Sequence, residues 1–431
     1  MTSLRFLFKD SVIYGGAIII NAIFMLLTIP ILTKNLTVNE YGIVDLFLTL
    51  LTFLVIIFVF GQDSSVARFF YEYKSIRKKK KIISESLYFQ LLVTILFLPI
   101  VYFLLRVNFE DNNNNLILLI ILQIPFFILI NFSQNILKWT FQKSKFIIIS
   151  VGSSFVILVG LILAFYFFEF TIYVVFYIYF ISRIVFGLLG LFFVRKWLCK
   201  VYKFTMIKDL VKYGYPFGII SLITAGLPFA ERVIVLNSLS AYELGLYSMA
   251  LKLTFFISLP IQAFQTAWGP FVYSNFKNEQ MYGLFNYVFK IYCIILLLLL
   301  LLLDFMKKYI ISILSSQDYL EASSIVFFLA LSIVILAIGN ILELGIDFSK
   351  KSYLKLYGFI FSFIISLSSS YFLINNYGFN YAGVGLVIGS ICKVIIDSFL
   401  AYKVHIIRWR LKQIFIIFFI IISFKFFIIG T

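Results

Sequence analysis

Basic side chains interrupt several long apolar stretches of this 431-residue chain. Arg183 and Lys252 lie near the middle of such stretches, and Arg232 lies near the end of another. A cation at the centre of a bilayer costs about 2.5–3.5 kcal/mol on insertion scales, so each one requires a partner or a function. An anionic passenger such as a pyrophosphate would supply the counter-charge, and we predict that these three residues bind it. Lys393 differs, because Asp397 follows one turn later and a neutralised structural pair explains it equally well.

Acidic side chains are rarer in the same stretches, and three of them are candidates for coupling transport to an ion. Asp45, Asp63 and Glu343 are predicted gating or coupling carboxylates, because acids within membrane spans commonly act as proton or ion sites. Arg68 stands one helical turn before Glu72 at the inner end of a stretch. This pair is either a gate or a solvated ion pair.

Polar residues also recur at helical spacing. Asp45, Thr49 and Thr52 fall at i, i+4 and i+7, so they share one face of a helix. Asn21 corresponds to Thr224 when the two halves of the chain are aligned at an offset of 203 residues. We predict that Asn21 and Thr49 contact the substrate, although such stripes also serve helix packing in membranes.

Composition restricts the class of protein. Hydrophobic residues make up 62% of the chain and charged residues only 13%, whereas soluble domains are roughly half apolar and a quarter charged. This excludes a soluble globular or disordered protein. The single histidine, His405, argues against metal sites and catalytic triads built on histidine. The sequence has no Walker-type phosphate loop, so we expect no cofactor and no direct use of ATP.

Twelve apolar stretches are long enough to cross a bilayer, which takes about 20 helical residues. We predict an all-α, polytopic membrane protein, because long unbroken runs are typical of helices and not of barrel strands. A further run, 413–430, is interrupted by Lys425 and is either a thirteenth span or an interfacial helix. The predicted core spans cover residues 11–33, 43–68, 83–106, 116–137, 146–168, 172–194, 213–236, 244–264, 283–303, 323–346, 356–374 and 381–402.

The net charge of +17 arises from 36 Lys and Arg residues against 19 acids. Most of the basic residues fall in every second loop, which places those loops and the N-terminus in the cytoplasm by the positive-inside rule. The basic run from Arg77 to Lys81 borders a span and has no interleaved aromatic residue. It predicts contact with anionic phospholipid head groups and no binding of nucleic acid.

Two segments 203 residues apart resemble each other. Residues 36–45 read LTVNEYGIVD and residues 239–248 read LSAYELGLYS, so leucine, a hydroxyl residue, glutamate and glycine recur in place. Six spans per half make the two repeats parallel, as in transporters whose lobes face each other across a cleft. We predict six-helix lobes over 1–203 and 204–402, followed by an extra hydrophobic segment over 403–431.

A family resemblance rests on three segments: LTVNEYGIVD (36–45), FQK (141–143) and AWGPF (267–271). They are similar to polysaccharide flippases of the O-antigen (Wzx) type, in the MATE/lipid II flippase (MOP) superfamily, and the similarity covers essentially the whole chain. The resemblance implies a protein of the bacterial cytoplasmic (inner) membrane. It would move undecaprenyl-pyrophosphate-linked oligosaccharide, such as lipopolysaccharide O-antigen units, from the inner to the outer leaflet by alternating access. It also implies polysaccharide polymerase machinery as a partner.

Two other functions are alternatives to this interpretation. An ion-coupled multidrug exporter of the same superfamily would need acids and not bases in its cleft, which the intramembrane cations oppose. A membrane glycan polymerase or ligase would need a sizeable outer loop with catalytic groups. The longest predicted outer loop, 304–322, has three acids, Asp304, Asp318 and Glu321. We therefore predict a transporter and not an enzyme.

Overall fold

A computed structural model describes residues 2–108, 114–275, 281–349, 351–405, 407 and 409. All regular structure in these ranges is helical, which confirms the predicted all-α class. The predicted span or interfacial helix over 413–430 lies outside the described residues. The first half of the chain forms α1 (Thr2–Asn35), α2 (Val38–Val59), α3 (Gln62–Glu72), α4 (Ile76–Asn108), α5 (Asn114–Ile121), α6 (Ile124–Trp139), α7 (Lys143–Phe167) and α8 (Ile172–Val194).

The second half is also helical. It forms α9 (Ile207–Ser238), α10 (Ala241–Leu253), α11 (Phe255–Asn275), α12 (Tyr282–Leu314), α13 (Ser323–Leu342), α14 (Leu344–Phe348), α15 (Lys355–Tyr377) and α16 (Val384–Val404). Short 3-10 turns lie at Arg195–Trp197, Gln317–Ala322, Ser352–Leu354 and Phe379–Tyr381. Within the described residues, twelve segments are long and apolar enough to cross a membrane, as predicted.

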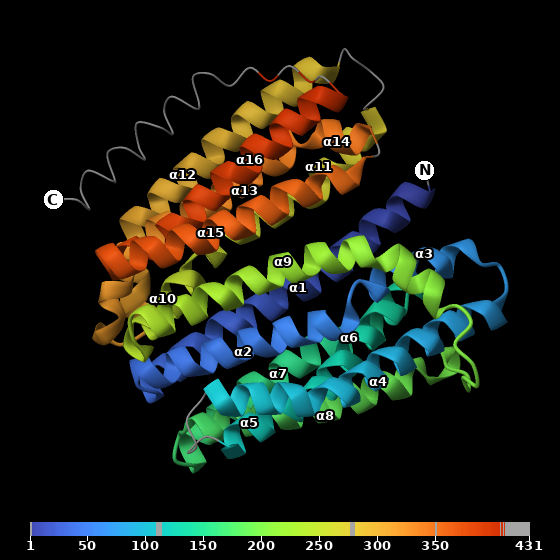
Figure 1. Cartoon of the computed structure of the whole chain (residues 1–431), viewed down its shortest axis with the longest axis horizontal. Coiled ribbons are helices and arrows are strands. Elements are labelled where there is room, and N and C mark those ends of the chain that lie inside the picture. The colour runs from blue at the N-terminus through green and yellow to red at the C-terminus, as the bar shows by residue number, and fades with distance from the viewer. Residues whose placement is uncertain are drawn as a thin grey trace. The chain divides into compact units, whose positions relative to one another are not determined.

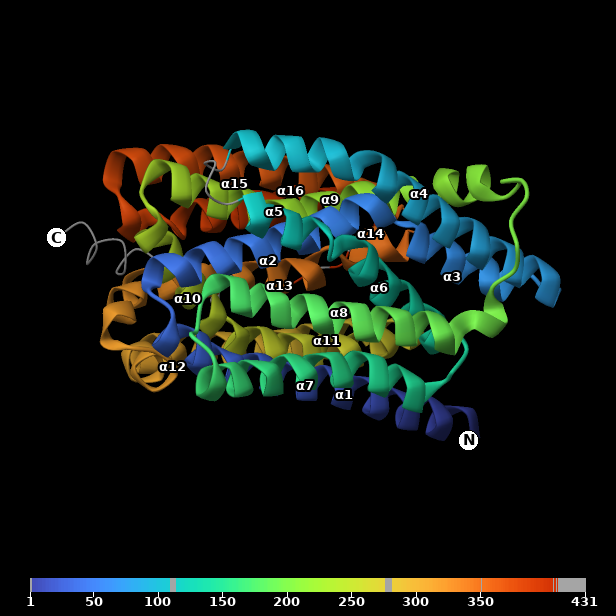
Figure 2. The same ribbon diagram turned by 90° about the horizontal axis from the view of Figure 1, so that it is seen from below.

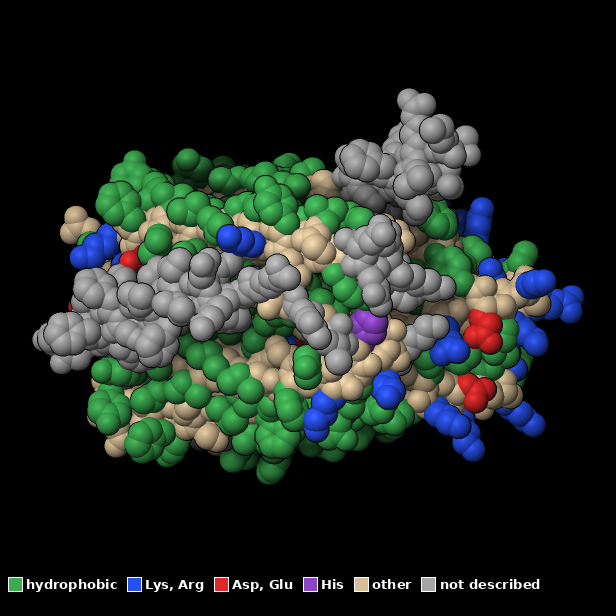
Figure 3. All heavy atoms as spheres, turned by 90° about the horizontal axis from the view of Figure 1, so that it is seen from above, with side chains coloured by type: hydrophobic (Ala, Val, Ile, Leu, Met, Phe, Trp, Pro, Cys, Tyr) green, Lys and Arg blue, Asp and Glu red, His purple; other side chains and the backbone are tan. Residues whose placement is uncertain are grey.

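Exposed side chains of these helices are largely apolar, as a bilayer requires. On α4, for example, Ile95, Leu96 and Phe103 are 65%, 62% and 64% exposed. In water such a surface would be unfavourable, whereas lipid tails cover it at no cost. Hydrophobic side chains cover most of the face shown in Figure 3, and basic side chains gather toward one end.

The second predicted span, 43–68, is wrong as a single helix. α2 ends at Val59 and α3 begins at Gln62, because Phe60 (φ 41°) and Gly61 (φ 69°) both adopt the left-handed conformation. Tertiary packing explains the break. A Cβ on Gly61 would lie 2.6 Å from the backbone nitrogen of Gly218 in α9, so only glycine permits this close approach.

Three other predicted spans contain interruptions that hydropathy does not show. The span 116–137 is divided at Gln123, just before Pro125, which cannot donate a helical hydrogen bond. The span 244–264 is divided at Thr254, and the span 323–346 at Glu343. Polar side chains therefore stand at the points where apolar helices are interrupted, where freed backbone groups also need partners.

The chain divides into two compact units. Unit 1 comprises Met1–Glu40 and Val44–Gly226, and unit 2 comprises Tyr41–Ile43 and Leu227–Thr431. The boundary between the two units at Gly226–Leu227 lies inside α9. The two lobes predicted over 1–203 and 204–402 were inferred from the similarity between the halves of the sequence. That division stays a prediction.

In unit 1, helices far apart in sequence pack together. α1 lies against α7, and α8 lies against both α6 and α7 (Figure 2). The segment that leads into α9 is held by Glu85 of α4, which is fully buried. Its carboxylate accepts hydrogen bonds from the backbone N–H groups of Thr205, Met206 and Ile207 at 3.1, 2.7 and 3.1 Å. A carboxylate at a helix N-terminus satisfies groups that have no partner within the helix.

In unit 2, α16 packs along α13 and α15 (Figure 1). Small residues allow the helices α15 and α16 to approach closely: a Cβ on Gly389 would lie 2.8 Å from the carbonyl oxygen of Ser362. Ser366 and Ser370 continue this face of α15 and are buried. Small residues at such spacing are typical of helix pairs in membranes, where close backbone contact replaces hydrophobic burial as the source of stability.

The two similar segments found in the sequence share a local design. Thr37 begins α2 with a capping box to Glu40, and Ser240 begins α10 with a side-chain bond to Glu243. The equivalent glycines meet within unit 2, where a Cβ on Gly42 would lie 2.6 Å from the backbone nitrogen of Gly245. Glycine at both positions is therefore explained by one close contact.

Candidate functional site

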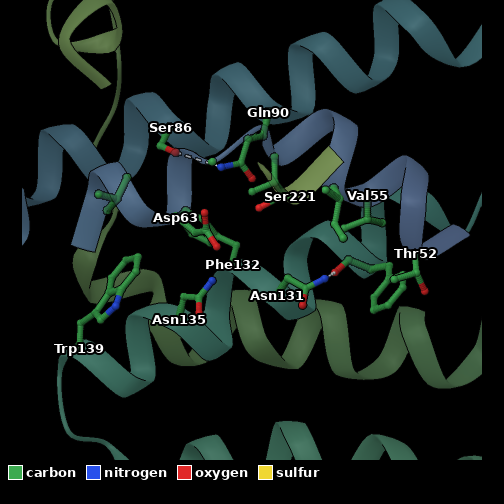
Figure 4. A pocket seen from close by; sticks show the side chains of 15 residues that line it. Thr52, Val55, Asp63, Ser86, Gln90, Asn131, Phe132, Asn135, Trp139 and Ser221 are labelled. Atoms are coloured by element: carbon green, nitrogen blue, oxygen red, sulfur yellow. Dashed lines mark hydrogen bonds between the residues drawn. The ribbon is translucent and has the colours of Figure 1, made fainter. Parts of the chain in front are cut away.

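A cavity of about 200 Å³ lies within unit 1, among α2, α3, α4, α6 and the first part of α9. We call it the unit-1 cavity (Figure 4). Its walls combine apolar side chains, uncharged polar side chains and one acid, Asp63. It is lined by Thr52, Val55, Ile56, Val59, Gly61, Asp63, Val66, Ser86, Gln90, Phe127, Asn131, Phe132, Asn135, Trp139 and Ser221.

One face of α6 supplies the longest wall of the unit-1 cavity. Phe127, Asn131, Asn135 and Trp139 follow one another at intervals of four residues, so they form a single stripe. The amide nitrogen of Asn131 donates to the carbonyl of Phe127 at 3.3 Å. Asn135 is half-buried, and its side chain makes no hydrogen bond to any residue in the described ranges. Two amides flanked by two aromatic rings thus face the cavity.

Asp63 lines the opposite wall, and the helix break at Gly61 places it there. It lies in the first turn of α3, where its carboxylate accepts the backbone N–H of Ser64 at 2.8 Å. Figure 4 shows the side chains of Asp63 and Asn135 pointing toward one another from different helices. Of the described residues that line the cavity, only Asp63 has an ionisable side chain. Lys138 lies close enough to interact with this charge electrostatically without lining the cavity.

A chain of polar side chains forms the remaining wall. Gln90 donates to the hydroxyl of Ser86 at 3.0 Å, and Ser86 donates to Gln62 at 2.8 Å. All three residues are buried, so the network fixes their orientations. Only the side-chain nitrogen of Gln90 takes part in this network, so its side-chain carbonyl oxygen can still accept a hydrogen bond from a ligand.

The predicted substrate-binding arginine of unit 1, Arg183, does not line the unit-1 cavity. It is 7% exposed, and its guanidinium donates a hydrogen bond to the side chain of Gln123 at the break between α5 and α6. It also lies over the rings of Phe127 and Tyr179, at 4.5 and 5.5 Å from their centroids. These contacts give Arg183 a packing role in this structure, and its phosphate-binding role stays a prediction.

The other predicted residues of unit 1 lie at separate positions. Asn21 donates to Ser150 of α7 at 2.7 Å, Thr49 donates to the carbonyl of Asp45 at 2.8 Å, and Asp45 is buried. Arg68 pairs with Glu72 at 3.6 Å on the surface. Asp63 is the one predicted site residue that lines the unit-1 cavity.

Two predicted cations belong to unit 2. Arg232 is 5% exposed and donates to the carbonyl of Pro228 at 2.8 Å. Lys252 lies in the last turn of α10, next to the interruption at Thr254. Beside Arg232, Glu231 is fully buried and accepts a hydrogen bond from Ser370 at 2.9 Å. The substrate-binding role of both cations stays a prediction.

Glu343, predicted to couple transport to an ion, lies at the centre of a charged cluster in unit 2. Its two carboxylate oxygens contact Lys355 at 2.8 Å and Lys393 at 3.0 Å. Lys393 also contacts Asp397 at 2.7 Å, and Lys355 contacts Asp347 at 2.8 Å. Lys393 and Asp397 therefore form the pair expected from their spacing. Within the described ranges, no group of three or more His, Cys, Asp or Glu residues is arranged to hold a metal ion.

A second cavity, of about 460 Å³, lies between α11 and α12 in unit 2. Its lining is almost wholly aliphatic and aromatic, and among the described lining residues only Tyr309 carries a polar side-chain group, too few to recognise a sugar or a phosphate. It is lined by Phe256, Ile257, Leu299, Leu302, Leu303, Met306, Tyr309, Ile310, Ile313 and Leu314.

The amides of α6 were not predicted as site residues. The signal was present, because Asn131 and Asn135 are two polar residues four apart within an otherwise apolar span. Charged residues within membrane spans are rare and therefore indicate function strongly. Uncharged amides within spans are a weaker indication, because they often serve helix packing. Only the tertiary structure shows that these two face a cavity.

The fold is that of a known class of membrane transporter. The chain matches the structure of the lipid II flippase MurJ in an inward closed conformation, with a TM-score of 0.75 and 16% identity over 95% of this chain and 89% of that one. It also matches an inward-facing multidrug resistance MATE family transporter of the MOP superfamily, with a TM-score of 0.72 and 16% identity over 89% and 94%. The MATE multidrug transporter DinF-BH gives a TM-score of 0.65 at 14% identity, over 93% and 95%.

The chain belongs to the polysaccharide biosynthesis protein family, whose sequence profile matches residues 7–270. A search of curated proteins finds no match. The chain is thus a polysaccharide biosynthesis protein with twelve candidate membrane spans and the fold of solved MATE and lipid II flippase structures. Both the family and the fold agree with the resemblance found in the sequence.

Proposed function

We propose that this transporter moves undecaprenyl-pyrophosphate-linked oligosaccharide, such as an O-antigen repeat unit, from the inner to the outer leaflet of a bacterial cytoplasmic membrane. The observation that carries the proposal is the unit-1 cavity, a site with several polar side chains and one carboxylate inside a membrane-spanning unit of a polysaccharide biosynthesis protein. A lipid tail needs no polar site to stay in the bilayer, whereas a glycan does. The passenger is therefore a lipid that carries a polar saccharide.

Orientation supports the direction of transport. The positive-inside rule favours a cytoplasmic N-terminus, and with this orientation α6 runs from the outer side to the inner side and ends near the cytoplasmic surface at Trp139. The unit-1 cavity then lies in the cytoplasmic part of unit 1. A lipid-linked saccharide that arrives from the inner leaflet reaches this part first. The basic run 77–81 contacts anionic phospholipids on the same side.

Cations hold the pyrophosphate in this proposal. Lys252 and Arg232 are the principal candidates, and Arg183 joins them if its bond to Gln123 opens. Charge-assisted bonds to phosphate are strong and directional, which suits these residue types. Asn21 and Thr49 add neutral polar contacts.

Carboxylates and the surface pair complete the proposed cycle. Asp45, Asp63 and Glu343 are the candidate coupling groups, and Arg68 is a candidate gate. Rocking between two conformations would expose the saccharide to one side and then to the other. On the outer side, polysaccharide polymerase machinery would receive the passenger.

Reconstituted vesicles test the proposal. Undecaprenyl-pyrophosphate-linked oligosaccharide is incorporated, and the fraction accessible to an added glycan-modifying enzyme is followed with time. We expect flipping that is slowed roughly ten- to hundredfold by Lys252→Ala, because one charge-assisted bond contributes about 1.5–3 kcal/mol. Exposed Lys403→Ala on α16 is the control at equal incorporation. The proposal fails if the wild-type protein moves no lipid-linked glycan, or if it confers drug resistance on a pump-deficient host instead.

A further inference from the structure

The polar groups that line the unit-1 cavity are mainly amides and hydroxyls, which are not the groups expected to bind a phosphate. Among the described residues that line the cavity, Gln90, Asn131 and Asn135 carry amides, and none is Lys or Arg. An amide offers donors and an acceptor together, as each sugar hydroxyl does, whereas a phosphate oxygen can only accept. The lining therefore matches a neutral polyhydroxylated group better than an anion.

Several of these groups are available to a ligand. Asn135 makes no hydrogen bond to any residue in the described ranges, and the carbonyl oxygen of Asn131 accepts none there. The side-chain hydroxyl of Ser221 on α9 likewise makes no hydrogen bond in those ranges, although the backbone carbonyl of Ser221 accepts one from Thr224 at 3.1 Å. Half-buried polar groups without partners gain free energy when a ligand supplies the missing bonds. Because they lie on different helices, they could surround one ligand.

Size and wall shape restrict that ligand. A volume of about 200 Å³ holds about seven waters at about 30 Å³ each, which is room for one sugar ring and not for an oligosaccharide. Phe127 and Trp139 close the two ends of the α6 stripe. Aromatic walls with a few placed polar groups are the usual composition of a small-molecule site, and the apolar face of a sugar ring can pack on them.

Charge sets the specificity. Among the described residues that line the cavity, Asp63 is the only ionisable one, and Lys138 interacts with it from outside the lining. A carboxylate on the sugar would meet the like charge of Asp63 at close range. We propose that the unit-1 cavity is a subsite for one uncharged sugar residue of the passenger, read by Asn131 and Asn135 and closed to acidic sugars by Asp63. The subsite rests on the proposed function, because it assigns a part of the same passenger.

Saturation-transfer NMR on the purified full-length protein in nanodiscs tests the subsite. The probes are glucose, galactose, N-acetylglucosamine, N-acetylgalactosamine and glucuronate, added singly. At least one neutral sugar should bind, and glucuronate should bind at least tenfold more weakly. The double variant Asn131→Ala, Asn135→Ala should weaken the neutral sugar at least tenfold, because both amides lose their bonds to its hydroxyl groups.

A matched control exists on α15. Asn376 is exposed, lies outside the cavity and donates to the carbonyl of Phe372 at 2.7 Å, four residues earlier, just as Asn131 donates to Phe127. Asn376→Ala should leave sugar binding unchanged. The subsite proposal is overturned if Asn376→Ala weakens neutral-sugar binding as much as the double variant does. It is also overturned if the double variant binds the neutral sugar as tightly as the wild type.

Asp63→Asn tests the charge argument separately. It should raise glucuronate binding at least fivefold while neutral-sugar binding stays within twofold. Unchanged glucuronate binding overturns the role of Asp63. Absence of binding by all the neutral sugars overturns the subsite as a whole.

The two proposals fail in different ways. If vesicles containing the wild type flip lipid-linked glycan and the double variant flips it equally fast, the subsite is wrong and the proposed function stands. If neutral sugars bind as expected and no lipid-linked glycan is moved, the proposed function is wrong.

Discussion

Lys393 shows how much one buried charge can depend on its neighbours. It is 3% exposed and contacts both Glu343 and Asp397, while its ammonium group lies 4.5 Å from the ring centroid of Phe359. Sequence spacing identified Asp397 as a partner but not Glu343, which is 50 residues away. The cluster binds α13, α15 and α16 together through charges that cannot be solvated by lipid.

Lys393→Met should therefore destabilise the protein strongly. Without Lys393 the buried carboxylate of Asp397 has no cationic partner, while Glu343 keeps only Lys355. Breaking a buried pair in this way lowers the free energy of unfolding by about 3–5 kcal/mol. Exposed Lys403→Met on the same helix should change it by less than about 0.5 kcal/mol. Denaturant unfolding in detergent, followed by circular dichroism, measures both. Equal stability of the two variants would show that the cluster contributes nothing to stability.

Among the helices, the interruptions position residues of the candidate site, although hydropathy does not reveal them. The break at Phe60–Gly61 ends α2 and starts α3, and the restart places Asp63 in the unit-1 cavity. Gly61 combines a positive φ with a close approach to α9, which are two independent reasons for glycine. The site therefore depends on a backbone feature and not only on side chains.

Gly61→Ala should destabilise unit 1 and disturb the cavity. The left-handed conformation alone costs about 1–3 kcal/mol for a residue with a side chain, and the contact with Gly218 adds to it. Gly16→Ala on α1 is the control, since a Cβ there meets nothing within 4 Å and should stabilise the helix by about 0.5–1 kcal/mol. In thermal inactivation of the purified proteins, Gly61→Ala should be inactivated at a lower temperature than the wild type and Gly16→Ala at a higher one. A neutral Gly61→Ala would contradict the packing argument.

For the whole molecule, the distribution of charge predicts which face is cytoplasmic. Basic side chains are exposed just before α4 and in its first turn, at Lys74, Arg77 and Lys78. The turn at Gln317–Ala322, in contrast, contains two acids and no basic residue. The positive-inside rule therefore assigns the first segment to the cytoplasm and the second to the outer side.

Cysteine labelling checks this orientation. In a background without Cys199, Cys293 and Cys392, a membrane-impermeant maleimide should label Gln317→Cys in intact cells and Lys78→Cys only after permeabilisation. Both positions are exposed in the structure, so access differs only through the membrane. Labelling of Lys78→Cys in intact cells would invert the orientation and reverse the proposed direction of transport.

The sequence by itself determined the helical class and the twelve spans, because crossing a bilayer requires long apolar helices that hydropathy reveals directly. Its motifs indicated the family, and it paired Lys393 with Asp397, since i, i+4 spacing is local; Asp63 as a coupling carboxylate stays a prediction. Only the tertiary structure decided where helices are interrupted, that both Lys355 and Lys393 contact Glu343, and that Asn131 and Asn135 face a cavity. Those features depend on contacts between helices distant in the chain, and neither local hydropathy nor spacing contains them.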